Sequence, residues 1–268
     1  MKIHRLLFLP IISFALLSGC LQVDTTVYIN KDGSGTIEEK VLMSDAVVEM
    51  MNEFMSSFQD SAKAPEEFNL YKEAELKEKA SGYGEGVEYV SGEEINTDGW
   101  QGYKAIYSFT DLNTITMETD PNAKVELDKS EEGKKNEYFS FKFIQGDVSE
   151  LIIDRPEIKP KITSDESGSE DENVDEAIDD SFLKLMEGMK VQISLTFEGD
   201  IVETNATYVD GSMVNLLDID FGELFKNKES LEMLKNNPPD NLEEMKEIVE
   251  NVPGMKIELQ RPVYIKFE

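Results

Sequence analysis

Short segments in which apolar and polar residues alternate recur along most of the chain, and this two-residue period constrains the fold more than any other feature. Successive side chains of a β-strand point to opposite faces, so each such segment predicts a strand with one buried face. The first runs from Val23 to Ile29, with positions 23, 25, 27 and 29 in the inward phase. The other segments are 36–42, 87–95, 102–109, 115–118, 123–127, 138–144, 150–153, 191–197, 201–204, 213–217, 255–259 and 263–267.

Helical spacing of apolar residues appears between these groups of strands. Ser44 has the side chain of a helix N-cap, and apolar residues recur after it at helical intervals as far as Phe58. Further helices are predicted at 66–80, 174–189, 221–226, 231–235 and 242–249. Strands and helices are grouped rather than strictly alternating. This order favours an α+β fold with a largely antiparallel β-sheet, or sheets, over a doubly wound α/β fold.

The charge of the chain is strongly acidic, with 26 lysines and arginines against 56 aspartates and glutamates and a net charge of -30. Such a surface repels phosphate backbones, so we expect no nucleic-acid binding. From Asp165 to Asp180 there are nine acids and no base. This composition predicts a flexible acidic loop at 161–180, between an N-terminal α+β part at 20–160 and a C-terminal α+β part at 181–268. The two parts are either separate or one domain.

Histidine and cysteine each occur once, as His4 and Cys20, near the start of the chain. The sequence beyond position 20 therefore excludes Ser-His-Asp and Cys-His catalysis, histidine-ligated zinc and an internal disulfide. It also contains no P-loop and no dinucleotide-binding glycine motif. We expect a protein without enzymatic activity, cofactor or metal. A hydrolase that uses two carboxylates is the enzymatic alternative, and Trp100 would mark its cleft.

The first twenty residues have the layout of an export signal. Lys2 and Arg5 precede an apolar run from Leu6 to Leu17, and small residues follow. This order is typical of a secretory signal, and the run is too short to cross a bilayer comfortably. The sequence Leu17-Ser18-Gly19-Cys20 resembles the bacterial lipoprotein box.

The lipoprotein resemblance implies that residues 1–19 are a signal peptide cut before Cys20. It further implies that the Cys20 thiol carries a diacylglyceryl group and that the new amine accepts another acyl chain, such as palmitate. Two or three acyl chains anchor a protein durably, whereas one is marginal. Leu21 follows the cysteine, which implies the outer membrane in a diderm bacterium and otherwise the outer face of the plasma membrane. Because a strand is predicted close after Cys20, the folded body is expected close to the bilayer.

A cluster of large apolar side chains marks the predicted helix after Ser44. Thioether side chains adapt to irregular apolar partners, so this helix is a candidate binding site for a lipid or another apolar ligand. Core packing is the alternative role. The candidate ligand-binding residues are Met50, Met51, Phe54, Met55 and Phe58.

Residues 30–37 have the ligand types of the first eight positions of an EF-hand calcium loop. The pattern fails at Val41, where the loop requires a bidentate glutamate, and its flanks alternate like strands instead of helices. We therefore predict a hairpin turn here rather than a calcium site.

A second resemblance lies in the segment from Val191 to Leu216, which is similar to the bacterial lipoprotein domain called LppM-like. The early turn at 32–35 also fits. Where members often have a proline and a tryptophan, this chain has Glu198 and Asn215. The resemblance implies a compact envelope domain that contacts lipids or glycolipids, and it carries over no catalytic residue. The matching residues are Phe197, Gly199, Ile201, Asn205, Asp210, Gly211, Met213 and Val214.

These features predict a non-enzymatic envelope lipoprotein, held in the membrane by acyl chains on Cys20, that binds a lipid or another apolar ligand. The alternative is an interaction module that docks an envelope protein through its acidic surface. Such docking would weaken as salt screens the exposed charges.

Overall fold

The computed structural model describes residues 21–57, 68–97, 99–118, 138–155, 188–227 and 242–268. Several sequence predictions fall outside these residues and are not tested by them. They are Cys20 and the signal at 1–19, Phe58, the strand at 123–127, the acidic loop at 161–180, most of the helix at 174–189 and the helix at 231–235.

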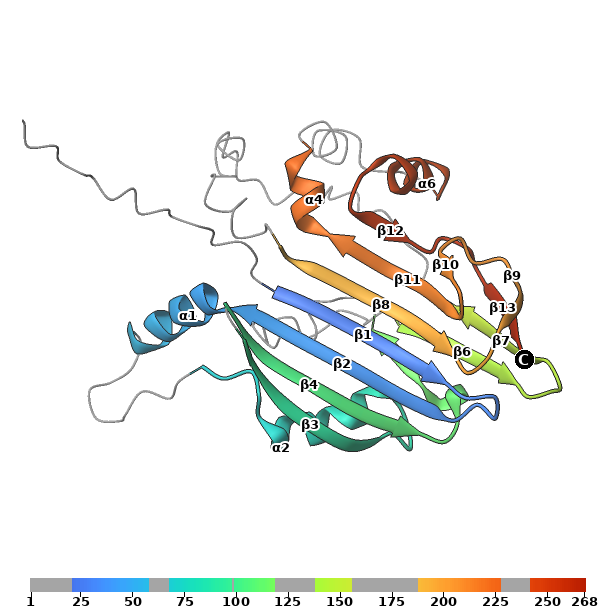
Figure 1. The fold of residues 1–268 in the computed structure, drawn as a ribbon, viewed down its shortest axis with the longest axis horizontal. Helices are drawn as coiled ribbons and strands as arrows, with labels where there is room; N and C mark the ends of the chain where they lie inside the picture. The colour runs from blue at the N-terminus through green and yellow to red at the C-terminus, as the bar shows by residue number, and fades with distance from the viewer. Residues whose placement is uncertain (1–20, 58–67, 98, 119–137, 156–187, 228–241) are drawn as a thin grey trace, which may run out of the picture.

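An eight-stranded sheet forms the larger layer of the fold, in the order β10-β11-β8-β1-β2-β4-β3, with β12 paired to β11 (Figure 1). All neighbouring strands in it are antiparallel except β1 and β8, which run parallel. The strands are β1 (Leu21–Ile29), β2 (Gly35–Ser44), β3 (Glu88–Thr97), β4 (Trp100–Phe109), β8 (Lys190–Phe197), β10 (Val209–Asp210), β11 (Met213–Asp220) and β12 (Met255–Ile257).

A five-stranded antiparallel sheet, in the order β5-β6-β7-β13-β9, forms the second layer. In each sheet, the strands from residues 21–154 lie on one side and those from residues 190–267 on the other, and the two groups meet where β8 pairs with β1 and where β13 pairs with β7. The strands are β5 (Thr116–Glu118), β6 (Tyr138–Ile144), β7 (Ser149–Asp154), β9 (Ile201–Thr204) and β13 (Val263–Phe267).

Short helices accompany the sheets, and the predicted α+β class with largely antiparallel sheets is confirmed. None of the described helices is long and apolar enough to cross a membrane. The helices are α1 (Asp45–Ser57), α2 (Glu73–Lys79), α4 (Phe221–Lys226) and α6 (Leu242–Asn251), with 3₁₀ turns η1 (Ala80–Tyr83) and η2 (Leu112–Thr114).

Two helix predictions were too long. The helix expected from 66 begins only at Glu73, because the Asn69 side chain accepts a hydrogen bond from the Tyr71 N–H at 2.7 Å and closes a turn that competes with helix. The helix expected to reach 189 does not include Gly188 or Met189, which are non-helical. Gly188 has a φ of 93°, in the left-handed region that interrupts a helix.

One hydrophobic core lies between the two sheets. Every second residue of β1 faces it, as the alternation predicted, and Val27 is fully buried. Leu151 and Phe267 from the smaller sheet and Leu76 from α2 belong to the same core cluster. α2, η1 and the five-stranded sheet therefore cover the same face of the larger sheet, which makes a two-layer sandwich.

The core also contains a carboxylate. Glu39 of β2 has 0% exposure and lies in the inward phase of its strand. Its carboxylate accepts hydrogen bonds from the Tyr103 hydroxyl at 2.7 Å, from the Lys79 ammonium at 2.6 Å and from the Tyr83 hydroxyl. A buried charge is stable only when it is paired and hydrogen-bonded, and these three donors satisfy that requirement.

The tyrosines around Glu39 remain protonated because of their surroundings. Burial raises the pKa of Tyr103 far above its ordinary value, and the negative Glu39 raises it further. The same two causes, in the same order, raise the pKa of Tyr83. Both phenols therefore stay hydrogen-bond donors to Glu39 over the whole physiological range.

The segment resembling a calcium loop is a hairpin turn between β1 and β2, as predicted. Asp32 Oδ1 accepts hydrogen bonds from the Ser34 N–H at 2.9 Å and from its hydroxyl at 2.6 Å, and these bonds lower the pKa of Asp32. Gly33 has a φ of 84°, which glycine adopts without strain. The turn thus uses its acidic side chain to close itself.

Candidate functional site

A cleft of about 740 Å³ opens where the start of β8, the end of β11 and the two C-terminal helices meet. Its strand side carries charged groups, and the side formed by α6 and the residues after it mixes apolar residues with Glu250 and Asn251. The residues that line it are Lys190, Thr207, Tyr208, Asp218, Asp220, Glu223, Val249, Glu250, Asn251, Val252, Pro253, Gly254, Met255 and Lys256.

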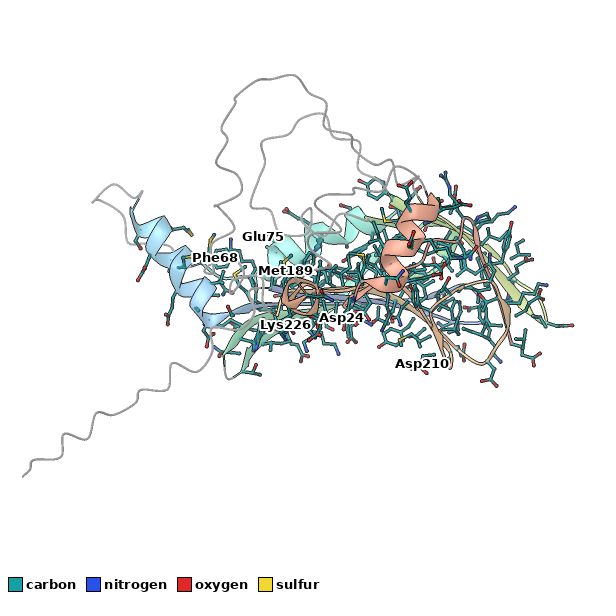
Figure 2. The ribbon with its side chains drawn as sticks, turned by 90° about the horizontal axis from the view of Figure 1, so that it is seen from above. Asp24, Phe68, Glu75, Met189, Asp210 and Lys226 are labelled. Carbon is teal, nitrogen blue, oxygen red and sulfur yellow. The ribbon has the colours of Figure 1, made fainter. Side chains whose placement is uncertain are left out.

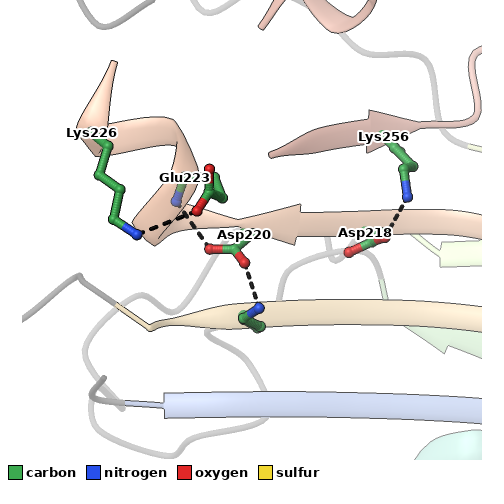
Figure 3. Close-up of polar contacts among 6 residues, drawn as sticks. Asp218, Asp220, Glu223, Lys226 and Lys256 are labelled. Atoms are coloured by element: carbon green, nitrogen blue, oxygen red, sulfur yellow. Dashed lines mark hydrogen bonds and ion pairs between the residues drawn. The ribbon is translucent and has the colours of Figure 1, made fainter. Parts of the chain in front are cut away.

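Strand register places the charged pairs of the cleft. In the antiparallel pairing of β8 and β11, Asp220 lies opposite Lys190, and the Lys190 Nζ to Asp220 Oδ2 distance is 2.5 Å (Figure 3). Asp218 lies opposite Lys256 of β12, and the Lys256 Nζ to Asp218 Oδ2 distance is 3.2 Å. Two lysine–aspartate pairs therefore stand side by side along β11.

Asp220 also begins α4. Its Oδ1 accepts a hydrogen bond from the Glu223 N–H at 3.0 Å, which is the bond of a helix N-cap. Within α4, Glu223 and Lys226 form a further ion pair of 3.3 Å that extends the charged rim (Figure 3). One aspartate thus holds together the strand end, the helix start and Lys190.

The protonation states of the central pair are set by these contacts. Burial alone would raise the pKa of the Asp220 carboxyl, but the hydrogen bonds from Lys190 and from the Glu223 N–H outweigh it and lower that pKa. The hydrogen bond to Asp220 in turn raises the pKa of Lys190. Both groups are consequently charged at neutral pH.

The wall opposite the strands is built by α6 and the chain that follows it. Ile248 and Val252 pack on Leu224 of α4 in a small separate cluster. Gly254 then approaches β11 closely, with its carbonyl accepting from the Asp220 N–H at 2.7 Å. A Cβ at Gly254 would come within 2.6 Å of the Asp220 carbonyl oxygen, and its φ is +80°. Glycine at 254 is therefore needed for the cleft to keep this shape.

The remaining wall is fixed by a second buried carboxylate. Glu258 is 1% exposed and accepts hydrogen bonds from the Gln260 N–H at 2.9 Å, from the Thr207 hydroxyl at 3.1 Å and from the Thr207 N–H. These bonds tie the segment after β12 to the loop before β10. They hold Thr207 at the edge of the cleft.

The arrangement favours reversible binding over proton transfer. A general acid or base needs a pKa near the working pH, whereas Asp220 and Lys190 are displaced in opposite directions away from neutrality. Lys190 and Lys256 each pair with an aspartate. A ligand that carries a positive and a negative group could take the place of one partner in such a pair. Among the described residues, no group of three or more acidic, histidine or cysteine side chains is placed to hold a metal ion.

The sequence-predicted ligand residues lie elsewhere. Met50, Met51, Phe54 and Met55 belong to α1, which follows β2, and none of the three methionines lines the cleft. Met50 is 48% exposed, and Met51 and Met55 are half-buried. Their role in ligand binding stays a prediction.

Sequence reasoning did not identify the cleft, because its residues come from segments distant in the chain. One local signal was present: Asp220 directly precedes the helix predicted at 221–226, in the position of an N-cap. The pairing of Asp220 with Lys190 depends on register between β8 and β11, which no short motif records.

Comparisons with known proteins add one distant likeness. No protein-family model matches the chain, and no curated protein matches it in sequence. A search of solved structures returns the NMR structure of the folded domain of Mycobacterium tuberculosis LppM, at 13% identity and a TM-score of 0.31, covering 76% of this chain and 85% of that one. This is the domain type that residues 191–216 resemble in sequence. At this TM-score the likeness carries no argument about function.

Proposed function

We propose that this protein is a non-enzymatic lipoprotein of the cell envelope that binds an amphiphilic ligand, such as a lipid, in the cleft beside β11. The observation that carries the proposal is the position of the cleft relative to Cys20. β1 begins at Leu21, directly after the lipoprotein box, and Gln22 lies opposite Lys190 in the parallel pairing with β8. A chain anchored through Cys20 thus holds the cleft beside the membrane.

The lining supports an amphiphile as the ligand class. Pro253 and Met255 expose apolar surface, and Val249 and Val252 line the cleft with 4% exposure each, while the Lys190–Asp220 and Lys256–Asp218 pairs supply both signs of charge. The charges of a zwitterionic head group can replace the lysine–aspartate contacts, and the apolar part of the same ligand can lie on the apolar residues of the cleft. Both charged states persist at neutral pH, which favours binding rather than catalysis.

The anchor is tested by replacing Cys20 with alanine in the producing cells. The wild type should fractionate with membranes and yield an N-terminal peptide whose mass includes acyl chains, whereas Cys20→Ala should yield neither. Ser18→Ala is the matched control, since it keeps a small residue before the cleavage site and should be lipidated normally. A wild type as soluble as Cys20→Ala would refute the anchor.

The ligand is tested by organic extraction of the purified full-length protein followed by mass spectrometry. We expect a lipid in stoichiometric amount in the wild type and a loss of roughly tenfold in the double variant Lys190→Met and Lys256→Met, since charge-assisted bonds contribute about 1.5–3 kcal/mol. The matched control is Lys104→Met. Lys104 does not line the cleft, and its ammonium pairs with the Glu38 carboxylate at 2.9 Å. Equal lipid content in all three proteins would contradict the cleft as the binding site.

A further inference from the structure

Helix α1 is amphipathic, and its polar side carries acids without any compensating base. Stepping by about 100° per residue, Val47, Met50, Met51 and Met55 fall on one side of the helix. The opposite side carries Asp45, Glu49 and Glu53 together with Asn52 and Ser56. No lysine or arginine lies in α1. Binding of α1 to another surface would therefore depend on its apolar side.

Among the residues that the structure describes, the protein body buries one margin of the apolar side. Val48 is buried, with 5% exposure, whereas Met50 is 48% exposed. Among the described elements, α1 contacts mainly β2 and β4. Figure 2 shows the helix extending away from the sheets, with Phe68 beside it, and the Phe68 N–H donates to Asn52 Oδ1 at 2.6 Å. The described residues therefore leave Met50 exposed and Val47, Met51 and Met55 only partly covered.

Helix α1 lies at the same end of the larger sheet as the start of β1. Leu21 lies opposite Met43 in the β1–β2 pairing, so β1 begins where β2 approaches α1. The Asp45 N–H donates to the Gly99 carbonyl at 3.1 Å, which attaches the start of α1 to the β3–β4 turn. Trp100 lies in that turn region, opposite Ser44. The start of β1 and α1 share one end of the larger sheet (Figure 1), and the pairing with Ser44 places Trp100 at the same end.

We propose that α1 and Trp100 form a second contact with the lipid bilayer, in which the apolar side of the helix enters the interfacial layer. This inference rests on the proposed acyl anchor at Cys20. With Leu21 already in β1, the anchor leaves no spacer, so this end of the sheet meets the membrane. Methionine and tryptophan suit this layer, because their apolar parts bury while the indole N–H stays wet. The acidic polar side predicts a preference for neutral over anionic lipids.

Trp100 is the only tryptophan in the chain and so reports on this end directly. The full-length lipidated protein is reconstituted into phosphatidylcholine vesicles made with or without brominated acyl chains. We expect bromine to reduce Trp100 emission about twofold, because an interfacial residue lies near the acyl boundary. Replacing a third of the neutral lipid with phosphatidylglycerol at low salt should weaken the quenching.

Matched variants separate the helix contact from the anchor. Met50→Glu places a charge on the apolar side and should remove most of the quenching, while Glu49→Gln on the polar side should preserve it. Moving the reporter in the variant Trp100→Phe with Val209→Trp places it in β10. Asp210 of β10 lies at the opposite end of the molecule from α1 (Figure 2), and Val209 is 40% exposed. That reporter should not be quenched.

The outcomes are distinct. Vesicle-bound wild type with an unquenched Trp100, or a Met50→Glu protein quenched like the wild type, overturns the second contact and leaves the anchor standing. If the protein does not co-migrate with vesicles in a flotation assay, both the anchor and the second contact are overturned. Urea unfolding of each variant verifies that exposed Met50 and Glu49 are replaced without loss of the fold.

Discussion

Two lysine–carboxylate pairs of this protein have similar geometry and opposite surroundings. Glu39 and Lys79 meet at 2.6 Å with the glutamate side chain fully buried and the lysine 25% exposed. Lys190 and Asp220 meet at 2.5 Å with the lysine 54% and the aspartate 21% exposed. Two tyrosine hydroxyls complete the shell of Glu39, while a helix N–H and solvent complete that of Asp220.

The comparison teaches that geometry alone does not fix the role of an ion pair. Breaking the Glu39–Lys79 pair is costly, because water cannot reach the buried carboxylate to replace the lost hydrogen bonds. The Asp220 pair can exchange its lysine for water or for a ligand at little cost. One pair therefore serves the sandwich, and the other suits a binding site.

The largest effect is expected from Glu39→Ala. It removes the acceptor of two buried hydroxyls and one ammonium, and it should lower the free energy of unfolding by about 3–5 kcal/mol in urea denaturation. Glu38→Ala, one residue away on the outer face, removes a half-buried partner of Lys104 and should cost at most about 1 kcal/mol. Equal losses would show that burial does not distinguish the two sites.

Alkaline unfolding is expected to show the next largest effect. The pKa values of Tyr83 and Tyr103 are raised in the folded state, above the ordinary value of 10.0. Above that pH the unfolded chain loses protons that the native state keeps, so stability falls as pH rises, by about 1.4 kcal/mol per pH unit for each phenol. Tyr103→Phe should reduce the dependence of the unfolding free energy on pH by the contribution of one phenol, measured by urea unfolding between about pH 9 and about pH 11. An unchanged slope would contradict the buried cluster.

Asp220→Ala should have an intermediate effect, about 1–2 kcal/mol, because it removes the cap of α4 and the partner of Lys190. Asp220→Asn keeps a capping side chain and should cost about 0.5 kcal/mol. The lowered pKa of Asp220 means that its charge contributes stability above its ordinary pKa of 3.8 and loses it as pH falls through the folded value. This acid-side contribution should be absent in Asp220→Asn, and its persistence would argue against the pair.

The smallest effect is expected from Lys256→Ala. Its ammonium is half exposed and pairs with Asp218 at 3.2 Å, so thermal and urea unfolding should change by less than about 0.5 kcal/mol. The same variant should still reduce the extracted lipid. A large loss of stability without loss of lipid would reverse the roles assigned to the core and the cleft.

Local sequence pattern predicted the strands well, because burial of one face imposes a two-residue period. The segments at 138–144, 201–204 and 263–267 match β6, β9 and β13 residue for residue. The signal for the buried carboxylate was also present, since Glu39 stands between Ile37 and Val41 in the inward phase of β2. Periodicity marks such a position but does not say which donors will surround it.

Long-range pairing lay beyond the sequence pattern. The insertion of β13 between β7 and β9, and the meeting of Lys190 with Asp220, depend on which strand edges remain free after the earlier strands pair. The helix expected from residue 66 begins later because the Asn69 side chain closes a turn, which helical propensity alone does not reveal. The methionines of α1 were placed on the correct helix, while their ligand-binding role awaits the tests above.

The parallel pairing of β1 with β8 has a consequence for biogenesis. The Thr26 and Ser194 hydroxyls lie 3.0 Å apart although 168 positions separate them in the chain. Under the proposed anchoring, the strand nearest the acylated cysteine is exported first, yet one of its edges waits for residues 190–197. Unpaired edges recruit other chains, and such distant pairing forms slowly. Under this order of export, the anchored β1 keeps an unpaired edge, open to association with other chains, until residues 190–197 have emerged.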